Sequence, residues 1–311
     1  MALPRMVLCM GERSIFSNLV RQADGAYSAV YGQYLLQSAL QPIFREQADG
    51  RLRIEAFKGL IRASTNGEPI SPAEFFHTVP EDERGAVDGL CRSLHILNAG
   101  LLGRADAALI INVHAGYYRS RQAMRQELEW LRLAAHEAGI APERIAFEIR
   151  QLPGDDPDAI ADFAERLHEN GFSIAIDEYT CEDRDLARLE QLKPRFVTFE
   201  TTWLHDFAEN SAGLALLRLV LGQFAQKNIH AIVAGIEEPK TITLCDEMGG
   251  PLMQGYLLAR PELAPTSFNI TFPDVSEEPA PAALDIHTHD TLGATDRRVV
   301  RPLRQFGRRV G

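Results

Sequence analysis

Two consecutive carboxylates, Asp177 and Glu178, end the largely apolar segment 172–176. Gly171 before the segment and the two isoleucines within it favour a buried β-strand over a buried helix. Two carboxylates at the end of a buried strand supply oxygen atoms that can bind a cation. The alternative is a strand whose acidic end simply enters solvent, so the rest of the chain has to decide between the two interpretations.

Polar or acidic side chains also stand near the C-terminal ends of the other predicted strands. Carboxylate and amide oxygens gathered at one mouth are typical of a site for Mg²⁺, Mn²⁺ or Ca²⁺. The alternative is a polar rim that binds no ligand. The residues concerned are Arg62, Asn112, Glu148, Glu200, Glu237 and Gln254.

The elements that must position these side chains alternate along the chain from residue 41. A closed α/β barrel of about eight parallel strands wrapped by helices is the leading prediction, and an open doubly wound sheet is the alternative. In both folds, functional side chains gather at the C-terminal ends of the strands. We expect strands at 41–44, 54–62, 107–113, 144–149, 172–178, 196–199, 230–234 and 252–258, and helices at 71–76, 83–99, 121–138, 156–170, 183–192, 211–227 and 239–248.

Composition restricts the class of protein. The chain has 311 residues, of which 45% are hydrophobic, enough for one large globular domain or two ordinary ones. No apolar run approaches the roughly 20 residues that cross a bilayer, and residues 1–10 do not resemble a signal peptide, so we expect a cytoplasmic protein. Four scattered cysteines without CxxC spacing suggest neither a zinc site nor a disulfide framework.

The charge is unevenly distributed. A net charge of −11 argues against general nucleic-acid binding by the body of the protein. Residues 285–311 carry six arginines and three aspartates, a local charge of +3, so the remainder carries −14. We expect this Arg-rich tail to contact an acidic protein partner, an anionic membrane or nucleic acid, and the alternative is that it docks on the protein's own negative surface.

Short motifs follow one another in a specific order along the chain. They are Gln41-Pro42-Ile43, Gly59-Leu60-Ile61-Arg62, Ile70-Ser71-Pro72, Ile111-Asn112-Val113, Phe147-Glu148-Ile149, Ile176-Asp177-Glu178, Ala234-Gly235-Ile236-Glu237 and Gln254-Gly255-Tyr256-Leu257. This ordered set resembles the EAL domain of bacterial cyclic di-GMP signalling. We therefore expect an N-terminal extension over 1–30, a degenerate EAL domain over 31–265, a flexible linker over 266–284 and the tail over 285–311.

The resemblance implies a modified TIM (β/α)8-like barrel, in a single domain. Active members of the family use two divalent cations, Mg²⁺ or Mn²⁺, to hydrolyse cyclic di-GMP to linear pGpG. Matched by position, the resemblance implies metal ligands at Asn112, Glu148, Asp177 and Glu178, with Glu200 a less faithful match to a further acid. It implies contacts with the nucleotide from Gln41, Leu60, Arg62, Gln254 and Glu237.

The departures from the family pattern concern the chemistry. Lys58 aligns with the signature glutamate, because the four-residue step to Arg62 is kept, whereas Glu55 lies three residues too early. Thr198 replaces a lysine and Ala234 replaces a glutamate. The residue three after Glu148 is Gln151 instead of an acid, and residues 179–183 replace the usual loop after the second acid.

We therefore predict a catalytically degenerate protein that needs no metal cofactor. It would act as a receptor for cyclic di-GMP or as a module that binds a regulatory protein, without hydrolytic activity in either role, and a homodimer is compatible with both. One alternative is an active phosphodiesterase that requires Mg²⁺ or Mn²⁺ and uses Glu55 after local rearrangement. A second is a regulatory scaffold that binds no nucleotide.

Overall fold

Eight strands close into a barrel. The computed structural model describes residues 18–118, 120–150 and 156–274, and all of them belong to one compact unit that ends at Asp274. Each barrel strand pairs with the next, and β3 pairs with both β4 and β11, which closes the ring and confirms the predicted barrel. The strands are β3 (Tyr34–Glu46), β4 (Leu52–Thr65), β6 (Ala108–His114), β7 (Ile145–Arg150), β8 (Ser173–Tyr179), β9 (Phe196–Phe199), β10 (His230–Val233) and β11 (Leu252–Met253).

One strand runs against the predicted direction. β3 is antiparallel to both of its barrel neighbours, β4 and β11, while the other barrel pairings are parallel. The turn 47–51 between β3 and β4 is too short for a crossover helix, so the two strands form a hairpin. The expectation of eight parallel strands was therefore wrong for β3. The strand expected over 252–258 also ends at Met253.

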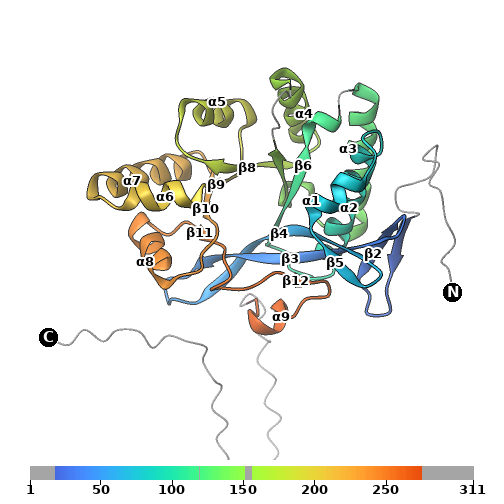
Figure 1. Cartoon of the computed structure of the whole chain (residues 1–311). Coiled ribbons are helices and arrows are strands. Elements are labelled where there is room, and N and C mark those ends of the chain that lie inside the picture. Colours follow the sequence, from blue (N-terminus) through green and yellow to red (C-terminus); the bar gives the residue numbers. More distant parts are fainter. Residues whose placement is uncertain (1–17, 119, 151–155, 275–311) are drawn as a thin grey trace, which may run out of the picture. The chain divides into compact units, whose positions relative to one another are not determined.

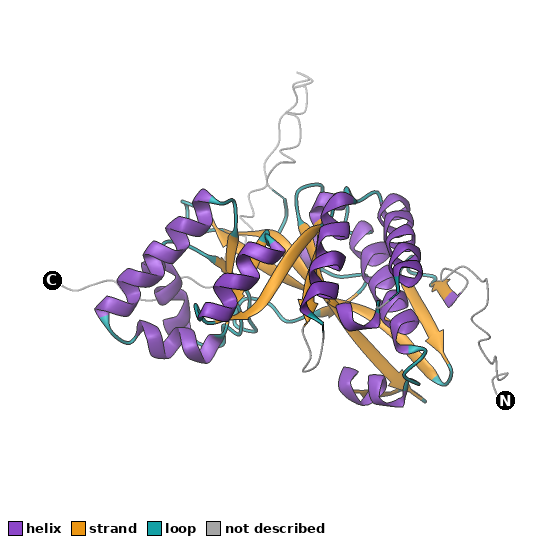
Figure 2. Cartoon of the chain, turned by 90° about the horizontal axis from the view of Figure 1, so that it is seen from above, coloured by secondary structure: helices purple, strands orange, loops and turns teal. Residues whose placement is uncertain are grey.

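Helices cover the outside of the barrel. Figure 1 shows them around the strands, and Figure 2 shows them on both sides of the strands when the molecule is seen from above. Six lie close to the predicted ranges: α2 (Arg84–Gly100), α3 (Arg121–Ala138), α4 (Pro157–Glu169), α5 (Asp183–Leu192), α7 (Ser211–Gln226) and α8 (Pro239–Met248). The short helices α6 (Thr201–Ala208), η2 (Ala115–Tyr117) and η3 (Pro142–Arg144) were not expected.

The β3–β4 hairpin continues beyond the barrel as an antiparallel sheet. Three short strands extend this sheet: β2 (Tyr27–Tyr31) pairs with β3, β5 (Glu68–Ile70) pairs with β4, and β1 (Leu19–Arg21) pairs with β2. Helix α1 (Pro72–Thr78) covers this sheet together with α2, and Phe75 is fully buried between them. Ser71 and Glu74 form the capping box that starts α1. The expected N-terminal extension over 1–30 thus contains two strands of the sheet.

A C-terminal segment covers the outer side of the hairpin, where no crossover helix lies (Figure 1). β12 (Glu262–Leu263) pairs with β3, and the ring of Phe268, in α9 (Phe268–Thr271), lies 5.9 Å from that of Phe57. Arg104 anchors the segment by donating to the carbonyl of Phe268 at 3.0 Å. Residues 266–274, expected to begin a linker, are therefore packed on the barrel.

Three expectations fall outside the described residues. Two concern the C-terminal part of the chain, the linker from residue 275 and the Arg-rich tail over 285–311, and the third concerns Gln151 in the body of the chain. Within the ranges that the structure describes, no helix combines the length and the apolar character needed to cross a membrane.

Candidate functional site at the barrel mouth

Eight of the positions singled out in the sequence form one layer inside the barrel. An apolar layer fills its interior and includes Ile43, Ala56, Ile110, Ala146, Ala175, Phe196, Ile232 and Leu252. Side chains alternate between the two faces of a strand, so the position two residues further toward the mouth also faces inward. Those positions are Gln41, Lys58, Asn112, Glu148, Asp177, Thr198, Ala234 and Gln254. The sequence motifs therefore converge on one mouth, at the C-terminal ends of the parallel strands.

The Lys58 ammonium lies between two carboxylates of this layer. Its Nζ donates to Glu148 Oε2 at 2.9 Å and to Asp177 Oδ2 at 3.3 Å. The Glu148 side chain is 1% exposed and that of Lys58 is 16% exposed, so water screens this pair weakly. Three residues from three strands, β4, β7 and β8, thus form a partly buried ionic group in the mouth.

Gly59 allows β4 to lie close to its neighbours next to Lys58. A Cβ at this position would lie 2.8 Å from Ile111 Cγ2 and 2.9 Å from Cγ of His95. His95, on α2, is buried and forms a 2.7 Å hydrogen bond with Ser38. Burial, together with the charges of Arg92 and Arg62, lowers the pKa of His95 to about 3, so this histidine is neutral. The close approach positions the strand segment that carries Lys58.

The three charged groups of the mouth shift each other's ionisation. Burial raises the pKa of Glu148 to about 7; Asp177 adds to the rise and Lys58 opposes it. For Lys58, burial disfavours the charged form, but attraction to Glu148 and Asp177 outweighs burial and raises its pKa. Burial also disfavours ionised Asp177, yet Lys58 and the backbone N–H of Glu178 keep its pKa below the usual range. Lys58 and Asp177 are therefore the charged pair, and Glu148 titrates near neutrality.

This shift predicts how stability changes with pH. Because the pKa of Glu148 rises from 4.5 to about 7 on folding, the folded state holds a proton there that the unfolded state has released, and stability falls as pH rises through this window. We expect the wild type to lose on the order of 3 kcal/mol between pH 4.5 and 7 relative to Glu148→Gln. Urea unfolding across this pH range measures the difference. The exposed Glu165→Gln is the control, and parallel pH profiles of wild type and Glu148→Gln would contradict the assignment.

Several buried polar atoms of the layer lack a hydrogen-bond partner within the described residues. They are Asn112 Oδ1, Glu148 Oε1 and Gln254 Nε2. Buried polar groups in folded proteins are almost always satisfied by protein, water or a ligand. Water or a polar ligand at this mouth would supply their missing hydrogen bonds.

The residues of this mouth do not fit a divalent cation as they are arranged. The Lys58 ammonium already contacts the oxygens of Glu148 and Asp177 that would coordinate one. Two unit positive charges about 4 Å apart repel each other by roughly 4 kcal/mol at an effective dielectric near 20. A divalent ion carries twice the charge, so Lys58 would repel it by about twice that energy. The described part of the chain also contains no group of three His, Cys, Asp or Glu residues that could hold a metal.

Three predicted acidic residues are not part of the layer. Glu178 lies in a β-bulge with φ of 55° and is exposed. Glu200 caps α6, and its carboxylate accepts from the N–H groups of Thr202 and Trp203. Glu237 is exposed beyond β10. The bulge thus turns Glu178 away from the layer, and the N-terminus of α6 engages Glu200.

Glu55 is held away from the mouth. It lies three residues before Lys58, about 10 Å along the strand, toward the opposite end of the barrel. Its carboxylate pairs with Arg53 at 2.8 Å and with Arg45 at 3.5 Å. Glu55 would therefore have to leave two arginines and change strand register to replace the missing acid.

A cavity of about 630 Å³ adjoins the mouth between β4 and β6. These strands pair only as far as Lys58 and Ile110, and β4 then continues without β6 beside it. Leu60, Arg62 and Asn112 line the cavity, together with α2. Gln41 lies on β3 opposite Lys58 and donates to the carbonyl of Ala259 at 3.4 Å. The structure thus brings the predicted nucleotide contacts Leu60 and Arg62 to a cavity that opens beside Lys58.

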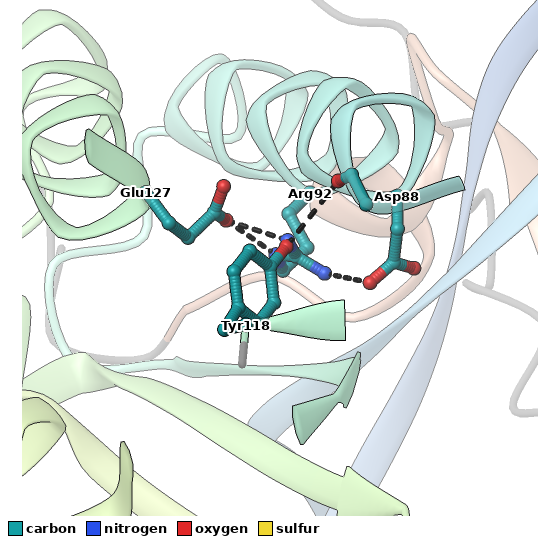
Figure 3. Close-up of polar contacts among 5 residues, drawn as sticks. Asp88, Arg92, Tyr118 and Glu127 are labelled. Atoms are coloured by element: carbon teal, nitrogen blue, oxygen red, sulfur yellow. Dashed lines mark hydrogen bonds and ion pairs between the residues drawn. The ribbon is translucent and has the colours of Figure 1, made fainter. Parts of the chain in front are cut away.

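A buried polar cluster that no motif of the sequence indicated lies at the base of this cavity (Figure 3). Arg92 is 1% exposed and contacts Asp88, the hydroxyl of Tyr118 and Glu127, donating from Nε to Glu127 Oε1 at 2.9 Å. Tyr118 donates in turn to the carbonyl of Gly85 at 3.3 Å. The cluster joins α2, α3 and the segment after β6. The available signal was Asp88 and Arg92 at i and i+4 within an otherwise apolar helical stretch.

Comparison with known proteins identifies a family and related folds. The model of the EAL domain family matches residues 32–261. The chain is 23% identical over 124 residues to the probable cyclic di-GMP phosphodiesterase PdeA of Escherichia coli K12, which is 40% of this chain and 17% of PdeA. It is 22% identical over 198 residues to the bifunctional diguanylate cyclase/cyclic di-GMP phosphodiesterase MucR of Pseudomonas aeruginosa, which is 63% of this chain and 28% of MucR. The chain thus spans less than a third of the length of either curated relative.

Solved structures share the fold. The Klebsiella pneumoniae BlrP1 calcium/cyclic di-GMP complex is 25% identical with a TM-score of 0.61, over 73% of this chain and 56% of that chain. The PaMucR phosphodiesterase complex with cyclic di-GMP is 19% identical with a TM-score of 0.59, over 74% of this chain and 92% of that chain.

Proposed function

This chain belongs to the EAL domain family, and we propose that it binds cyclic di-GMP at the barrel mouth without hydrolysing it. The observation that carries the proposal is the ion pairing of Lys58 with Glu148 and Asp177. An internal ammonium occupies the carboxylates on which a metal-dependent hydrolase would rely. The relatives named above are cyclic di-GMP phosphodiesterases, which supports the nucleotide as the ligand class.

The residues of the mouth disfavour hydrolysis. Activation of water in this family needs divalent cations, which lower the pKa of a bound water and neutralise charge on the phosphate. Lys58 supplies positive charge but no coordination site, and Ala234 offers no ligand atom where the family has a glutamate. Thr198 replaces a lysine and is 5% exposed in the same layer. Three changes in one layer thus remove charge and ligands that the reaction requires.

The same mouth retains features that support nucleotide binding. Among the described residues, no carboxylate pairs with Arg62, whose guanidinium lines the cavity and donates from Nη1 to the carbonyl of Ile61. An arginine fork can hold a phosphodiester by two hydrogen bonds without a metal. The unpartnered atoms of Asn112 and Gln254 offer an acceptor and a donor in the inward-facing layer of the mouth. Metal-independent binding through Arg62, Gln41 and Gln254 follows from these groups.

Titration calorimetry with cyclic di-GMP tests the proposal. We expect equal affinity in EDTA and in Mg²⁺, and a loss of roughly 10- to 150-fold in Arg62→Ala, because a hydrogen bond to a charged group contributes about 1.5–3 kcal/mol. Arg51→Ala, an exposed arginine in the β3–β4 turn, is the matched control. Binding that strictly requires Mg²⁺ would contradict the metal-independent mode.

A turnover assay on the same samples distinguishes the alternatives. We expect no pGpG in Mg²⁺ or Mn²⁺. Sustained pGpG production that Glu148→Ala abolishes would instead establish an active phosphodiesterase. No nucleotide binding by folded protein would favour the scaffold that binds a regulatory protein. Because the chain spans part of its relatives' length, a regulatory partner and a homodimer remain proposals for the whole protein.

A further inference from the structure

We propose that the opposite end of the barrel holds a second ligand site, for a small carboxylate with an apolar body. This site does not depend on the proposed nucleotide function. It is a cavity of about 300 Å³ beside the first residues of β10 and β11, between these strands and the C-terminal part of α7. Arg45 lines it from the C-terminal end of β3. That end of β3 lies beside the first residues of β10 and β11 because β3 runs antiparallel to its neighbours.

Arg45 shares its carboxylate partner with a second arginine. Its Nε lies 3.5 Å from Glu55, but that carboxylate is closer to Arg53, at 2.8 Å, so one acid serves two arginines. On the other side, Arg45 Nη2 lies 3.3 Å from Nδ1 of His230. Burial, Arg45 and Arg195 lower the pKa of His230, so its neutral ring accepts from Arg45 and adds no negative charge. An anion is the ligand charge that this arrangement favours.

Arg195 adds a further positive charge near His230. Its Nη1 donates to the backbone carbonyl of Glu143, and no carboxylate in the described ranges forms an ion pair with it. Arg45 itself is 33% exposed, and a guanidinium has five N–H donors, of which the contacts to Glu55 and His230 engage part. The remaining donors can form two parallel hydrogen bonds to an incoming carboxylate.

Apolar side chains form much of the remaining cavity wall, beside His230 and Asn228. Leu221, Phe224, Ile229 and Pro251 line it, and Phe224 is 4% exposed. A wall that combines apolar side chains with a few polar groups is usual for a small-molecule pocket, and the volume lies at the lower end of the usual range. A ring or branched chain would occupy the apolar part while its carboxylate reaches Arg45. Shape and charge together therefore indicate an amphipathic monocarboxylate rather than inorganic phosphate.

Calorimetry with phenylacetate tests the site on the full-length protein. We expect saturable binding of phenylacetate and markedly weaker binding of acetate, which lacks the apolar body, and of phenylacetamide, which lacks the charge. Absence of saturable binding up to about 10 mM phenylacetate would overturn the proposal. Equal binding of phenylacetamide would overturn it as well, since Arg45 would then have no role.

Two variants locate the binding. Arg45→Gln is expected to weaken phenylacetate binding at least about tenfold, whereas Arg51→Gln, whose arginine is 66% exposed on the adjacent turn, should bind as the wild type does. Ala225→Leu keeps Arg45 but fills part of the cavity from α7 and should also abolish binding; it decides the matter if Arg45→Gln does not fold. Unchanged binding in a folded Ala225→Leu variant would refute the location. Cyclic di-GMP binding should be the same in all three variants, so failure here is distinguishable from failure of the proposed function.

Discussion

Replacing Arg92 with methionine is expected to lower the free energy of unfolding by about 3–5 kcal/mol, the usual cost of leaving a buried charge without its partner. Arg92 contacts two carboxylates, Asp88 and Glu127, and both are almost fully buried. Burial already raises the pKa of Glu127, with Arg92 opposing the rise. Methionine fills similar volume but offers no charge or donor, so the two acids and the Tyr118 hydroxyl lose their common partner.

Urea unfolding at pH 7 measures this loss. Arg166→Met is the matched control, because Arg166 pairs with Asp162 at i and i−4 on α4 but on the surface. That variant should unfold at the same urea concentration as the wild type. Adding Glu127→Gln to Arg92→Met should recover part of the stability, since it removes one of the unpaired charges. Equal midpoints for Arg92→Met and Arg166→Met would show that the cluster contributes little.

Replacing Lys58 with glutamate is expected to raise the affinity for Mn²⁺ by at least about 100-fold. The change removes an ammonium and adds a carboxylate beside Glu148 and Asp177, and each unit of charge near the ion contributes several kcal/mol in this poorly screened mouth. Since every 1.4 kcal/mol is a factor of ten, two orders of magnitude is a modest expectation. Three carboxylates would then stand where Lys58 now pairs with two, and together they would form a site for an external cation.

Calorimetry with Mn²⁺ measures the gain, and Lys240→Glu is the control. Lys240 pairs with Glu238 and is 72% exposed, so the same change of charge there should leave metal affinity as in the wild type. Lys58→Glu should also be less stable than the wild type without metal and should regain stability as Mn²⁺ is added. Similar Mn²⁺ affinities for Lys58→Glu and the wild type would contradict the view that Lys58 takes the place of a cation.

Restoring metal affinity is not expected to restore hydrolysis at once. Ala234 still lacks a ligand atom, and the bulge at Glu178 turns the second acid of the pair into solvent. The triple change Lys58→Glu, Thr198→Lys, Ala234→Glu is expected to gain metal affinity first. The segment 179–183, which differs from the family's loop, would still limit activity.

Local pattern was enough to place most elements of the fold. The helices predicted over 121–138, 183–192 and 239–248 match α3, α5 and α8 residue for residue. Ser120 and Gly139 bound α3 as an N-cap and a left-handed C-cap, which are signals carried by single residues. Periodicity and caps act within a few residues, so the sequence displays them directly.

By itself the sequence also placed Asn112, Glu148 and Asp177 near the C-terminal ends of their strands, which parallel strands bring to one rim of the barrel. It did not determine the direction of β3, the bulge at Glu178 or the capping role of Glu200. Nor did it reveal that Lys58 and Asp177, 119 residues apart, would form an ion pair. Those features depend on strand register and on the packing of distant segments, which no local pattern encodes and which exist only once the barrel has closed.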